Sequence, residues 1–569
     1  MLLQGHRLFE KPAFLLAAGA IVAILVFFIN LGSDGIYAPQ EGRTALIVRQ
    51  MIRSGNFMDM DLEHTVKYEK PIGHYWLCLP SSILAGLGGD ALEVPVEWAI
   101  RFPSAVCALF VVLIAGALAF RLYGVKTSAL TMVVLSLSPT FSHLGRLAHI
   151  DMPLACTFAA AMYFLYRGYF EEFKSNKKIY LFYLMLGLGV LLKGPLPVLL
   201  AGCVILGMLL WSRRWKMLRE LRPLTGSLVL LAVALPWYIA EHIRTNGAFF
   251  DEFIVNQNFR RFTGIGSTYR GGRRMPVYYY FPKLLAGFLP WSLAVFPGLF
   301  FFRKPLWKLR FRTGTVFLIM WTLTLFIFFS GSALKRGDYL LPLYPALAIL
   351  LARTIVLGCE KLPALSKHWL KLWLVLCVLL AAAAVVNYSG VLIRLGDYIA
   401  VHDIPHVSQR DGMTLAMISR YINQYYFFAL AGVFAVAGLL YGICHLMEKR
   451  RYFAALTLFT VIVFGIFTCY HALIQPGTDY LKTVKSFCRD AVKAVPPGEK
   501  ILHSGDFNTE LIFFMDRPYT VDSGEPVRFV LASPESAEKI HKDFPGVWKE
   551  LCRTPEKHQY PAVLLEKTK

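Results

Sequence analysis

"PAFLLAAGAIVAILVFFINL", residues 12–31, is an uninterrupted apolar stretch near the start of a chain of 569 residues. It is long enough for a membrane-spanning helix, and no small-x-small cleavage site follows it, so we interpret it as a retained span. Similar stretches recur along the chain, which is 56% hydrophobic and only 17% charged. This composition excludes an ordinary soluble protein and predicts a polytopic α-helical membrane protein.

The distribution of basic loops predicts the topology. About thirteen apolar segments have spanning length. Loops rich in Lys and Arg, such as "SRRWKMLRELR" and "FRKPLWKLRFR", fall on one side when these segments are threaded through a membrane. The positive-inside bias makes that side cytoplasmic, and an odd number of spans then places the C-terminal tail in the periplasm. The same bias accounts for most of the formal charge of +22, so nucleic acid is not an expected partner.

The chain is expected to divide into two domains. Residues 1–470 form the transmembrane domain, with a large first periplasmic loop (32–99) and an Arg-rich one (244–280). Within the first loop, "PQEGRTALIVRQMIRSG" has Pro39 and Gly55 where a helix begins and ends, and we expect that helix to lie at the membrane surface.

Residues 471–569 are expected to form a small α/β domain in the periplasm. This tail combines the helical stretch "DYLKTVKSFCRDAVKAV" with short apolar runs, "KILHSG", "LIFFM" and "AVLLE". Cys488 and Cys552 both lie in it, and in an oxidising compartment we expect them to form a disulfide.

Polar residues gather in four segments on the predicted periplasmic side, where charges beside apolar spans indicate function. The segments contain Gln40, Glu41 and Arg43; Glu69, Lys70, His74 and Tyr75; Arg146, His149 and Asp151; and Arg260, Arg261, Arg270, Arg273 and Arg274.

The fourth segment has five arginines on the predicted periplasmic side, where the positive-inside bias predicts few. Arginine binds phosphate oxygens through paired, charge-assisted hydrogen bonds. Together with Lys70 and Lys193, these arginines predict a site for a phosphate headgroup. For Arg270, Arg273 and Arg274, contact with anionic lipid or solvent is the alternative.

Two carboxylates, Glu41 and Asp151, are candidates for a base or a metal ligand. The alternative for each is a structural ion pair, Glu41 with Arg43 and Asp151 with Arg146. The sequence contains no Cys/His metal spacing, no P-loop and no G-x-S-x-G elbow.

The neighbouring groups have simpler alternatives. Glu69 and Lys70 could pair with each other. His74 and His149 fit ordinary interfacial polar residues better than they fit metal ligands.

Six short motifs occur in a recognisable order: the "QEGR" segment, "YEKP", Arg-x-x-x-x-Asp-Met, "KGP", "FLPW" (288–291) and "LLPLYPAL" (340–347). This order resembles the GT-C glycosyltransferases, in particular the bacterial branch with the lipid A aminoarabinose transferases, which is related to the protein O-mannosyltransferases. The resemblance implies the GT-C fold with a periplasmic α/β domain. It also implies transfer of a sugar, with inversion, from a polyprenyl-phosphate donor to a lipid A, glycan or protein acceptor.

The charged segments and the resemblance together predict roles for individual residues. The catalytic positions are Gln40, Glu41 and Asp151. The donor phosphate is bound by Arg43, Lys70, Lys193, Arg260 and Arg261. The positions that orient the substrate are Tyr68, Glu69, Asn258 and Tyr339.

Two positions depart from the family pattern. Gln40 replaces the usual catalytic aspartate, and a glutamine cannot take a proton. Asn258 stands where relatives often carry a histidine, so a divalent metal is possible but weakened, and no other cofactor is expected. Either Glu41 or Asp151 is then the base, or catalysis relies on stabilising the departing phosphate.

Two other functions remain open. A lipid or sugar transporter would need charges near mid-membrane or matched halves, and we find neither pattern. A catalytically inert relative that binds polyprenyl phosphate would be consistent with Gln40. The sequence identifies neither the sugar nor the acceptor.

Overall fold

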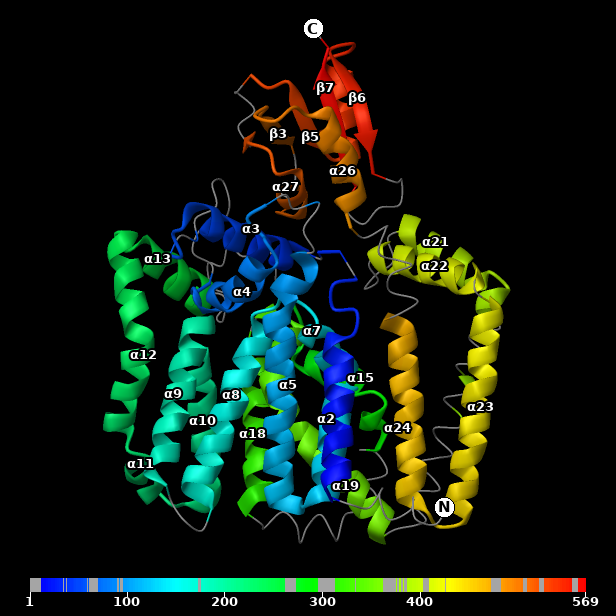
Figure 1. The fold of residues 1–569 in the computed structure, drawn as a ribbon. Coiled ribbons are helices and arrows are strands. Elements are labelled where there is room, and N and C mark those ends of the chain that lie inside the picture. The colour runs from blue at the N-terminus through cyan, green and yellow to red at the C-terminus, as the bar shows by residue number, and fades with distance from the viewer. Residues whose placement is uncertain are drawn as a thin grey trace.

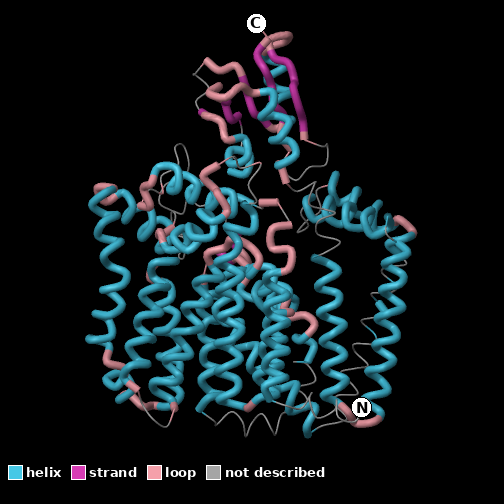
Figure 2. Tube along the Cα trace, in the orientation of Figure 1, coloured by secondary structure: helices cyan, strands magenta, loops and turns pink. Residues whose placement is uncertain are grey.

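The structure is a computed structural model in which helices predominate (Figures 1 and 2). The residues that it describes are 12–33, 35–36, 38–58, 60, 70–89, 92, 96–171, 175–260, 273–294, 313–332, 334–361, 375, 378–379, 382, 386–402, 409–424, 426–471, 483–504, 509–520, 526–554 and 561–568.

Long helices run side by side and form the body of the molecule (Figure 1). Among the described residues, five helical segments are long and apolar enough to cross a membrane. They are α5 (Val96–Tyr123), α12 (Pro223–Arg244), α18 (Thr313–Gly331), Gly337–Cys359 and α24 (Tyr452–Cys469). Shorter apolar helices are α2 (Pro12–Phe28), α6 (Val125–Ser136), α10 (Leu196–Ser212) and Ala435–Glu448 of α23 (Tyr426–Glu448). The chain is therefore a multi-pass membrane protein, while the count of thirteen spans stays a prediction.

The remaining helices of the bundle connect and buttress these. They are α7 (Pro139–Gly145), α8 (Asp151–Leu165), α9 (Asn176–Lys193), α11 (Lys216–Glu220), α13 (Ala248–Phe250) and α15 (Tyr280–Gly287), whereas α19 (Tyr344–Lys361) forms most of the segment Gly337–Cys359. Large apolar side chains on the outside of the bundle fit a lipid environment, because Leu224 and Leu228 of α12 are 85% and 66% exposed. Trp291 and Trp321, by contrast, are completely buried in the core.

Helix α3 (Ala38–Ser54) contains the first polar segment and has the predicted bounds. Gly55 follows it with φ +69°, the left-handed conformation that often ends a helix. The helix lies across one end of the bundle together with α4 (Gly73–Leu84), beneath the small domain (Figure 1). Ala45, Val48 and Met51 are completely buried, so α3 is enclosed by other protein and does not present a broad wet face.

The small domain has a five-stranded mixed sheet in the order β4-β3-β5-β7-β6. Its strands are β3 (Ile501–Ser504), β4 (Tyr519–Thr520), β5 (Phe529–Ala532), β6 (Trp548–Arg553) and β7 (Val563–Lys567). β3 pairs in parallel with β4 and β5, whereas β7 pairs antiparallel with β5 and β6. The helices are α26 (Lys485–Ala494), α27 (Thr509–Met515) and α28 (Pro534–Asp543). An α/β tail was predicted, but the run "LIFFM" is helix α27, since its apolar residues are buried on all sides.

The predicted disulfide in this domain is wrong. Cys488 and Cys552 are both free thiols. Cys488 is buried on α26 with its Sγ 4.0 Å from the carbonyl oxygen of Leu511, while Cys552 is part of strand β6. Burial raises the pKa of Cys488 well above its usual value and that of Cys552 to about 11, which disfavours the thiolate that disulfide formation needs.

The small domain docks directly on α3. Arg53 donates two hydrogen bonds to the carboxylate of Asp516, at 2.8 and 2.7 Å, and Arg49 donates to the carbonyl oxygen of Phe513 at 2.8 Å. At Gly42 a β-carbon would come within 2.6 Å of Thr509 Oγ1, so only glycine allows this approach of α27. The domain thereby fixes the helix that carries Gln40 and Glu41.

A hairpin of two amphipathic helices lies at the same end of the bundle (Figure 1). It consists of α21 (Val391–Val401) and α22 (Gln409–Gln424).

Candidate active site

Six polar side chains from four parts of the chain meet where α3 crosses the end of the bundle. We call them the polar cluster: Gln40, His149, Asp151, Lys193, Arg336 and Asp338.

Local structure explains how two of these side chains meet. Asp151 is the first residue of α8, and Lys193 is the last residue of α9. Gly194, in the "KGP" motif, ends α9 with φ +72°. A carboxylate at a helix N-terminus and an ammonium at a helix C-terminus are each favoured by the helix dipole. The two helices pack together, and Lys193 Nζ forms an ion pair with Asp151 Oδ1.

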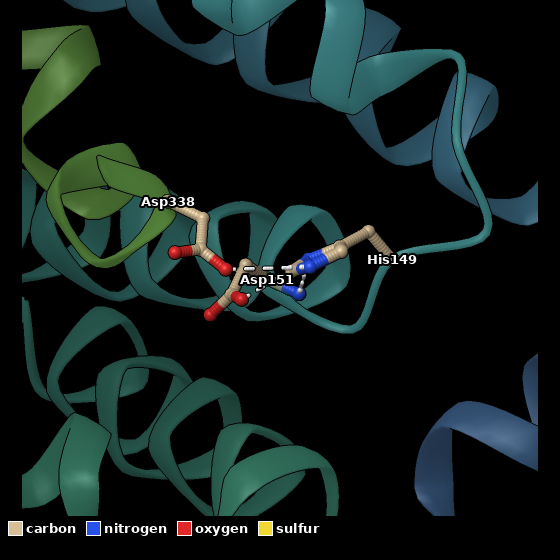
Figure 3. A group of neighbouring side chains, drawn as sticks. All are labelled: His149, Asp151 and Asp338. Carbon is tan, nitrogen blue, oxygen red and sulfur yellow. Dashed lines mark hydrogen bonds and ion pairs between the residues drawn. The ribbon is translucent and has the colours of Figure 1, made fainter. Parts of the chain in front are cut away.

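His149 is held between two carboxylates (Figure 3). Its Nδ1 lies 3.1 Å from Asp151 Oδ2, and its Nε2 lies 3.3 Å from Asp338 Oδ2. Asp338 is in the 3-10 helix η5 (Gly337–Leu343) and also pairs with Arg336, at 2.9 Å from Nη2. Asp151 therefore pairs with Lys193 and Asp338 with Arg336, and both carboxylates contact the imidazole of His149.

Gln40 joins the polar cluster from α3. The guanidinium of Arg336 can only donate, so the side-chain oxygen of Gln40 faces it, at 3.1 and 3.2 Å from Nη1 and Nη2. The side-chain nitrogen of Gln40 then lies 2.5 Å from His149 Nε2 and donates to it. Gln40 is thus bound to both Arg336 and His149.

The cations are the accessible part of the polar cluster. The side chains of Lys193 and Arg336 are 22% and 28% exposed. Those of Asp151 and Asp338 are only 3% and 9% exposed. An approaching anion would therefore meet the cations first.

Glu41, the neighbour of Gln40, belongs to a different network. Both of its carboxylate oxygens accept hydrogen bonds from Arg101, at 3.0 and 2.8 Å. The backbone N–H of Ala148 donates to Oε1 at 2.7 Å. Arg101 also donates to the carbonyl oxygens of Leu31 and Gly35, and its side chain and that of Glu41 are 1% and 4% exposed. The ion-pair alternative holds for Glu41, with Arg101 as a partner that the sequence had not indicated.

Arg146, the expected partner of Asp151, caps the end of α2. It donates to the carbonyl oxygens of Val26, Ile29 and Asn30 at 2.8, 2.7 and 3.0 Å. A helix C-terminus leaves such carbonyls without intrahelical partners. Asp151 pairs with Lys193 and His149.

The second predicted segment lies close to the polar cluster. Burial lowers the pKa of His74 to about 3, with Lys70 and His149 acting in the same direction and Asp151 opposing them. Asp151 and His149 of the third segment are thus close neighbours of His74. Lys70 is half-buried near the start of α4.

Other predicted site residues have varied outcomes. Tyr339 lies beside the polar cluster, with its ring centroid 5.0 Å from Lys193 Nζ. Arg43 is half-buried on α3, one helical turn from Gln40. Arg260 is exposed and donates to Asn256 Oδ1 at 2.8 Å. Residues 68, 69, 261 and 270 and the side chains of residues 258, 273 and 274 lie outside the part of the chain that the structure describes.

The polar cluster has the spacing of a metal site but not its charge balance. His149, Asp151 and Asp338 offer ligand atoms that all lie within 4.8 Å of one another. Both carboxylates are already paired, with Lys193 and Arg336, and two adjacent cations would repel a metal ion. We therefore treat the group as an ion-pair network.

Comparison with known proteins identifies the fold. The crystal structure of ArnT from Cupriavidus metallidurans bound to undecaprenyl phosphate superposes with a TM-score of 0.73, covering 96% of this chain and 97% of ArnT at 21% identity. The chain has the GT-C fold. The apo structure of the same ArnT gives a TM-score of 0.70. In addition, the family model for dolichyl-phosphate-mannose-protein mannosyltransferase matches residues 71–239 of this GT-C chain.

Two sequence relatives are named as aminoarabinose transferases. An undecaprenyl phosphate-α-4-amino-4-deoxy-L-arabinose arabinosyl transferase from Enterobacter sp. is 30% identical over 336 residues, 58% of this chain and 57% of the relative. A second, from Pseudomonas fluorescens, is 28% identical over 338 residues, 59% of this chain and 58% of the relative. The matches thus cover less than two thirds of these relatives' own length. The resemblance to aminoarabinose transferases predicted from the motifs is confirmed.

Three residues of the site were not found from the sequence. Arg336 and Asp338 lie in "KRGDY", directly before the recognised "LLPLYPAL" motif, so a charged segment beside a motif was the available signal. Arg101 lies in an apolar helix start, where a buried arginine demands a partner.

Proposed function

We propose that this GT-C chain is a membrane glycosyltransferase that moves a sugar from a polyprenyl-phosphate donor to an acceptor at the periplasmic membrane surface, with inversion. The observation that supports this best is the arrangement of the polar cluster. Two accessible cations, Lys193 and Arg336, cover two buried carboxylates and an imidazole.

The cations provide the site for the donor phosphate. Transfer breaks the bond between the anomeric carbon and a phosphate oxygen, and negative charge develops on the departing polyprenyl phosphate. Lys193 and Arg336 stabilise that charge through charge-assisted hydrogen bonds, and Lys70 adds a third positive charge. Because Lys193 and Arg336 are partly buried, these interactions are stronger than they would be in solution.

The other predicted donor contacts extend this site. Arg43, Arg260 and Arg261 are proposed to hold the rest of the donor headgroup, and Tyr68, Glu69, Asn258 and Tyr339 to orient the sugar. The contact between Lys193 and the ring of Tyr339 supports the placement of Tyr339.

The proposed setting is the bacterial inner membrane. The transmembrane domain covers residues 1–470 with about thirteen spans, and residues 471–569 form the periplasmic domain. Undecaprenyl phosphate is the expected carrier, because it is named for the relatives and for the bound ArnT structure. Lipid A, a glycan or a protein is the acceptor.

A donor-release assay tests the proposal. The purified chain in lipid nanodiscs is given undecaprenyl-phosphate-linked sugars, including 4-amino-4-deoxy-L-arabinose, with lipid A as acceptor. Mass spectrometry should detect free undecaprenyl phosphate and a glycosylated acceptor.

Two other outcomes would replace the proposal. Movement of the intact donor across proteoliposomes without release would indicate a flippase. Binding of undecaprenyl phosphate without release of sugar from any donor would indicate the inert relative.

A further inference from the structure

The hydrogen bonds around Gln40 define which nitrogen of His149 carries a proton. Arg336 donates to the oxygen of Gln40 and so turns the amide nitrogen toward His149 Nε2. An amide N–H can donate to Nε2 only if that nitrogen has a free lone pair. The ring proton is then on Nδ1, because the acceptor Asp151 Oδ2 lies 3.1 Å away and is closer to this nitrogen than the backbone nitrogen of Asp151, at 3.4 Å.

The charges of the polar cluster agree with a neutral ring. Asp151 and Asp338 are each paired with one cation, Lys193 and Arg336 respectively. Two negative and two positive charges cancel, so no proton on His149 is needed for balance. An aspartate in place of Gln40 would add a third carboxylate beside Nε2, and the ring would then be held as an imidazolium.

We propose that His149 is the proton acceptor of the transfer step, and that Gln40 keeps its Nε2 unprotonated for this purpose. The inference rests on the proposed function and specifies its acceptor as a neutral hydroxyl group. The acceptor hydroxyl takes the place of the Gln40 amide at Nε2.

The step balances as follows. The hydroxyl oxygen forms a bond to the anomeric carbon while its proton moves to His149 Nε2. The bond from that carbon to the phosphate oxygen breaks, and its electron pair leaves with the polyprenyl phosphate. Asp338, 3.3 Å from Nε2, then becomes the partner of the new N–H, and Asp151 remains the partner of Nδ1–H. Both carboxylates stabilise the imidazolium that forms.

The groups that act on His149 come from every element around it. They are Gln40 from α3, Lys70 and His74 at the start of α4, Asp151 from α8, Lys193 from α9, and Arg336 and Asp338 beside η5.

Nitrogen-15 NMR tests the tautomer directly, without any substrate. The chain is labelled at histidine in lipid nanodiscs, and the His149 signals are assigned by their loss in His149→Gln. The wild type should show a protonated Nδ1 and an unprotonated Nε2, and Gln40→Asp should protonate both nitrogens. A protonated Nε2 in the wild type would overturn the inference.

Kinetics tests the role in transfer. With undecaprenyl phosphate-4-amino-4-deoxy-L-arabinose as donor, lipid A from which the phosphates have been removed offers hydroxyl groups only. His149→Gln should reduce release of undecaprenyl phosphate by about 10²–10⁴-fold, while binding of undecaprenyl phosphate stays within threefold. The acid limb of the wild-type pH profile should be absent from the residual activity. The exposed His143, replaced in His143→Gln, is the matched control and should behave as the wild type.

The outcomes separate this inference from the function on which it rests. Retained activity or an unchanged pH profile in His149→Gln would overturn the role of His149 and leave the proposed function intact. Transfer only to phosphate-bearing lipid A would overturn the hydroxyl assignment. Absence of release by the wild type from any donor would count against the proposed function, and the NMR result would still decide the tautomer.

Discussion

Gln40 and Glu41 are adjacent on α3, yet they belong to two networks with opposite properties. Glu41 accepts three hydrogen bonds from Arg101 and Ala148, and its side chain is only 4% exposed. Gln40 contacts His149 and Arg336, in a cluster whose cations face an accessible surface. In the first network, both carboxylate oxygens of Glu41 accept hydrogen bonds from buried donors. In the second network, the imidazole of His149 lies between the carboxylates of Asp151 and Asp338.

This difference distinguishes a structural ion pair from a reactive site. A carboxylate whose lone pairs are already occupied by a buried guanidinium and a backbone N–H has little capacity left for a substrate. A histidine between two carboxylates can change its protonation, because partners for both states are in place. We therefore propose that Glu41 serves folding and that the polar cluster carries the chemistry.

The largest effect is expected at Arg101. Arg101→Ala leaves Glu41 as a buried charge without its guanidinium, which costs about 3–5 kcal/mol of the free energy of unfolding. Thermal unfolding in detergent should show a strongly lowered midpoint, with little folded protein recovered.

A double replacement sharpens this expectation. Arg101→Leu combined with Glu41→Leu removes both charges and should restore much of the lost stability. If Arg101→Ala were as stable as the wild type, the distinction between the two networks would be lost.

Asp151→Asn should reduce activity strongly while the protein still folds. It removes the partner of Lys193 and the acceptor for His149 Nδ1–H. Loss of one partner of a desolvated charged pair costs about 2–5 kcal/mol, so transfer should fall by tens to thousands of fold. Release of undecaprenyl phosphate measures the loss, and the thermal midpoint should change far less than in Arg101→Ala. Unfolding of Asp151→Asn to the same extent would assign Asp151 to the structural network.

The smallest effect is expected where the far end of α3 meets the small domain. Asp516 is partly exposed, so its pairs with Arg53 and Arg49 contribute about 0–1 kcal/mol. Although burial opposes it, the hydrogen bonds of Arg53 and the charges of Arg49 and Arg517 lower the pKa of Asp516. The contribution is therefore present at neutral pH and is lost as the pH falls through that lowered value.

Thermal unfolding of Asp516→Asn against pH checks this sign. The variant should be slightly less stable than the wild type at neutral pH, and the two should converge in acid. If the difference in stability between the variant and the wild type grew as the pH fell, the expected sign would be contradicted.

Local sequence signals predicted much of this structure. Pro39 and Gly55 mark the ends of α3. Motif order led to the GT-C resemblance before any geometry was known. These features depend on short segments, in which backbone preference and residue type act together.

The partners in the two networks could not be predicted in this way. Arg101 lies sixty residues from Glu41 in the sequence, and nothing local to either residue indicates the other. The orientation of the Gln40 amide depends on Arg336, which reaches it only through the fold. The state of the expected cysteine pair also depends on the fold, because Cys488 on α26 and Cys552 on β6 pack in the same apolar cluster and yet remain free thiols.

The central claim is that the accessible cations of the polar cluster bind the donor phosphate. The affinity of the purified chain for undecaprenyl phosphate tests it most directly, in the wild type, in Lys193→Ala and in Arg121→Ala. Arg121 is an exposed arginine near the C-terminal end of α5, where it pairs with Glu171, and it is the matched control. The Kd should rise at least about tenfold in Lys193→Ala, as expected for loss of a charged hydrogen bond, and stay unchanged in Arg121→Ala. Equal affinity in all three proteins would contradict the claim.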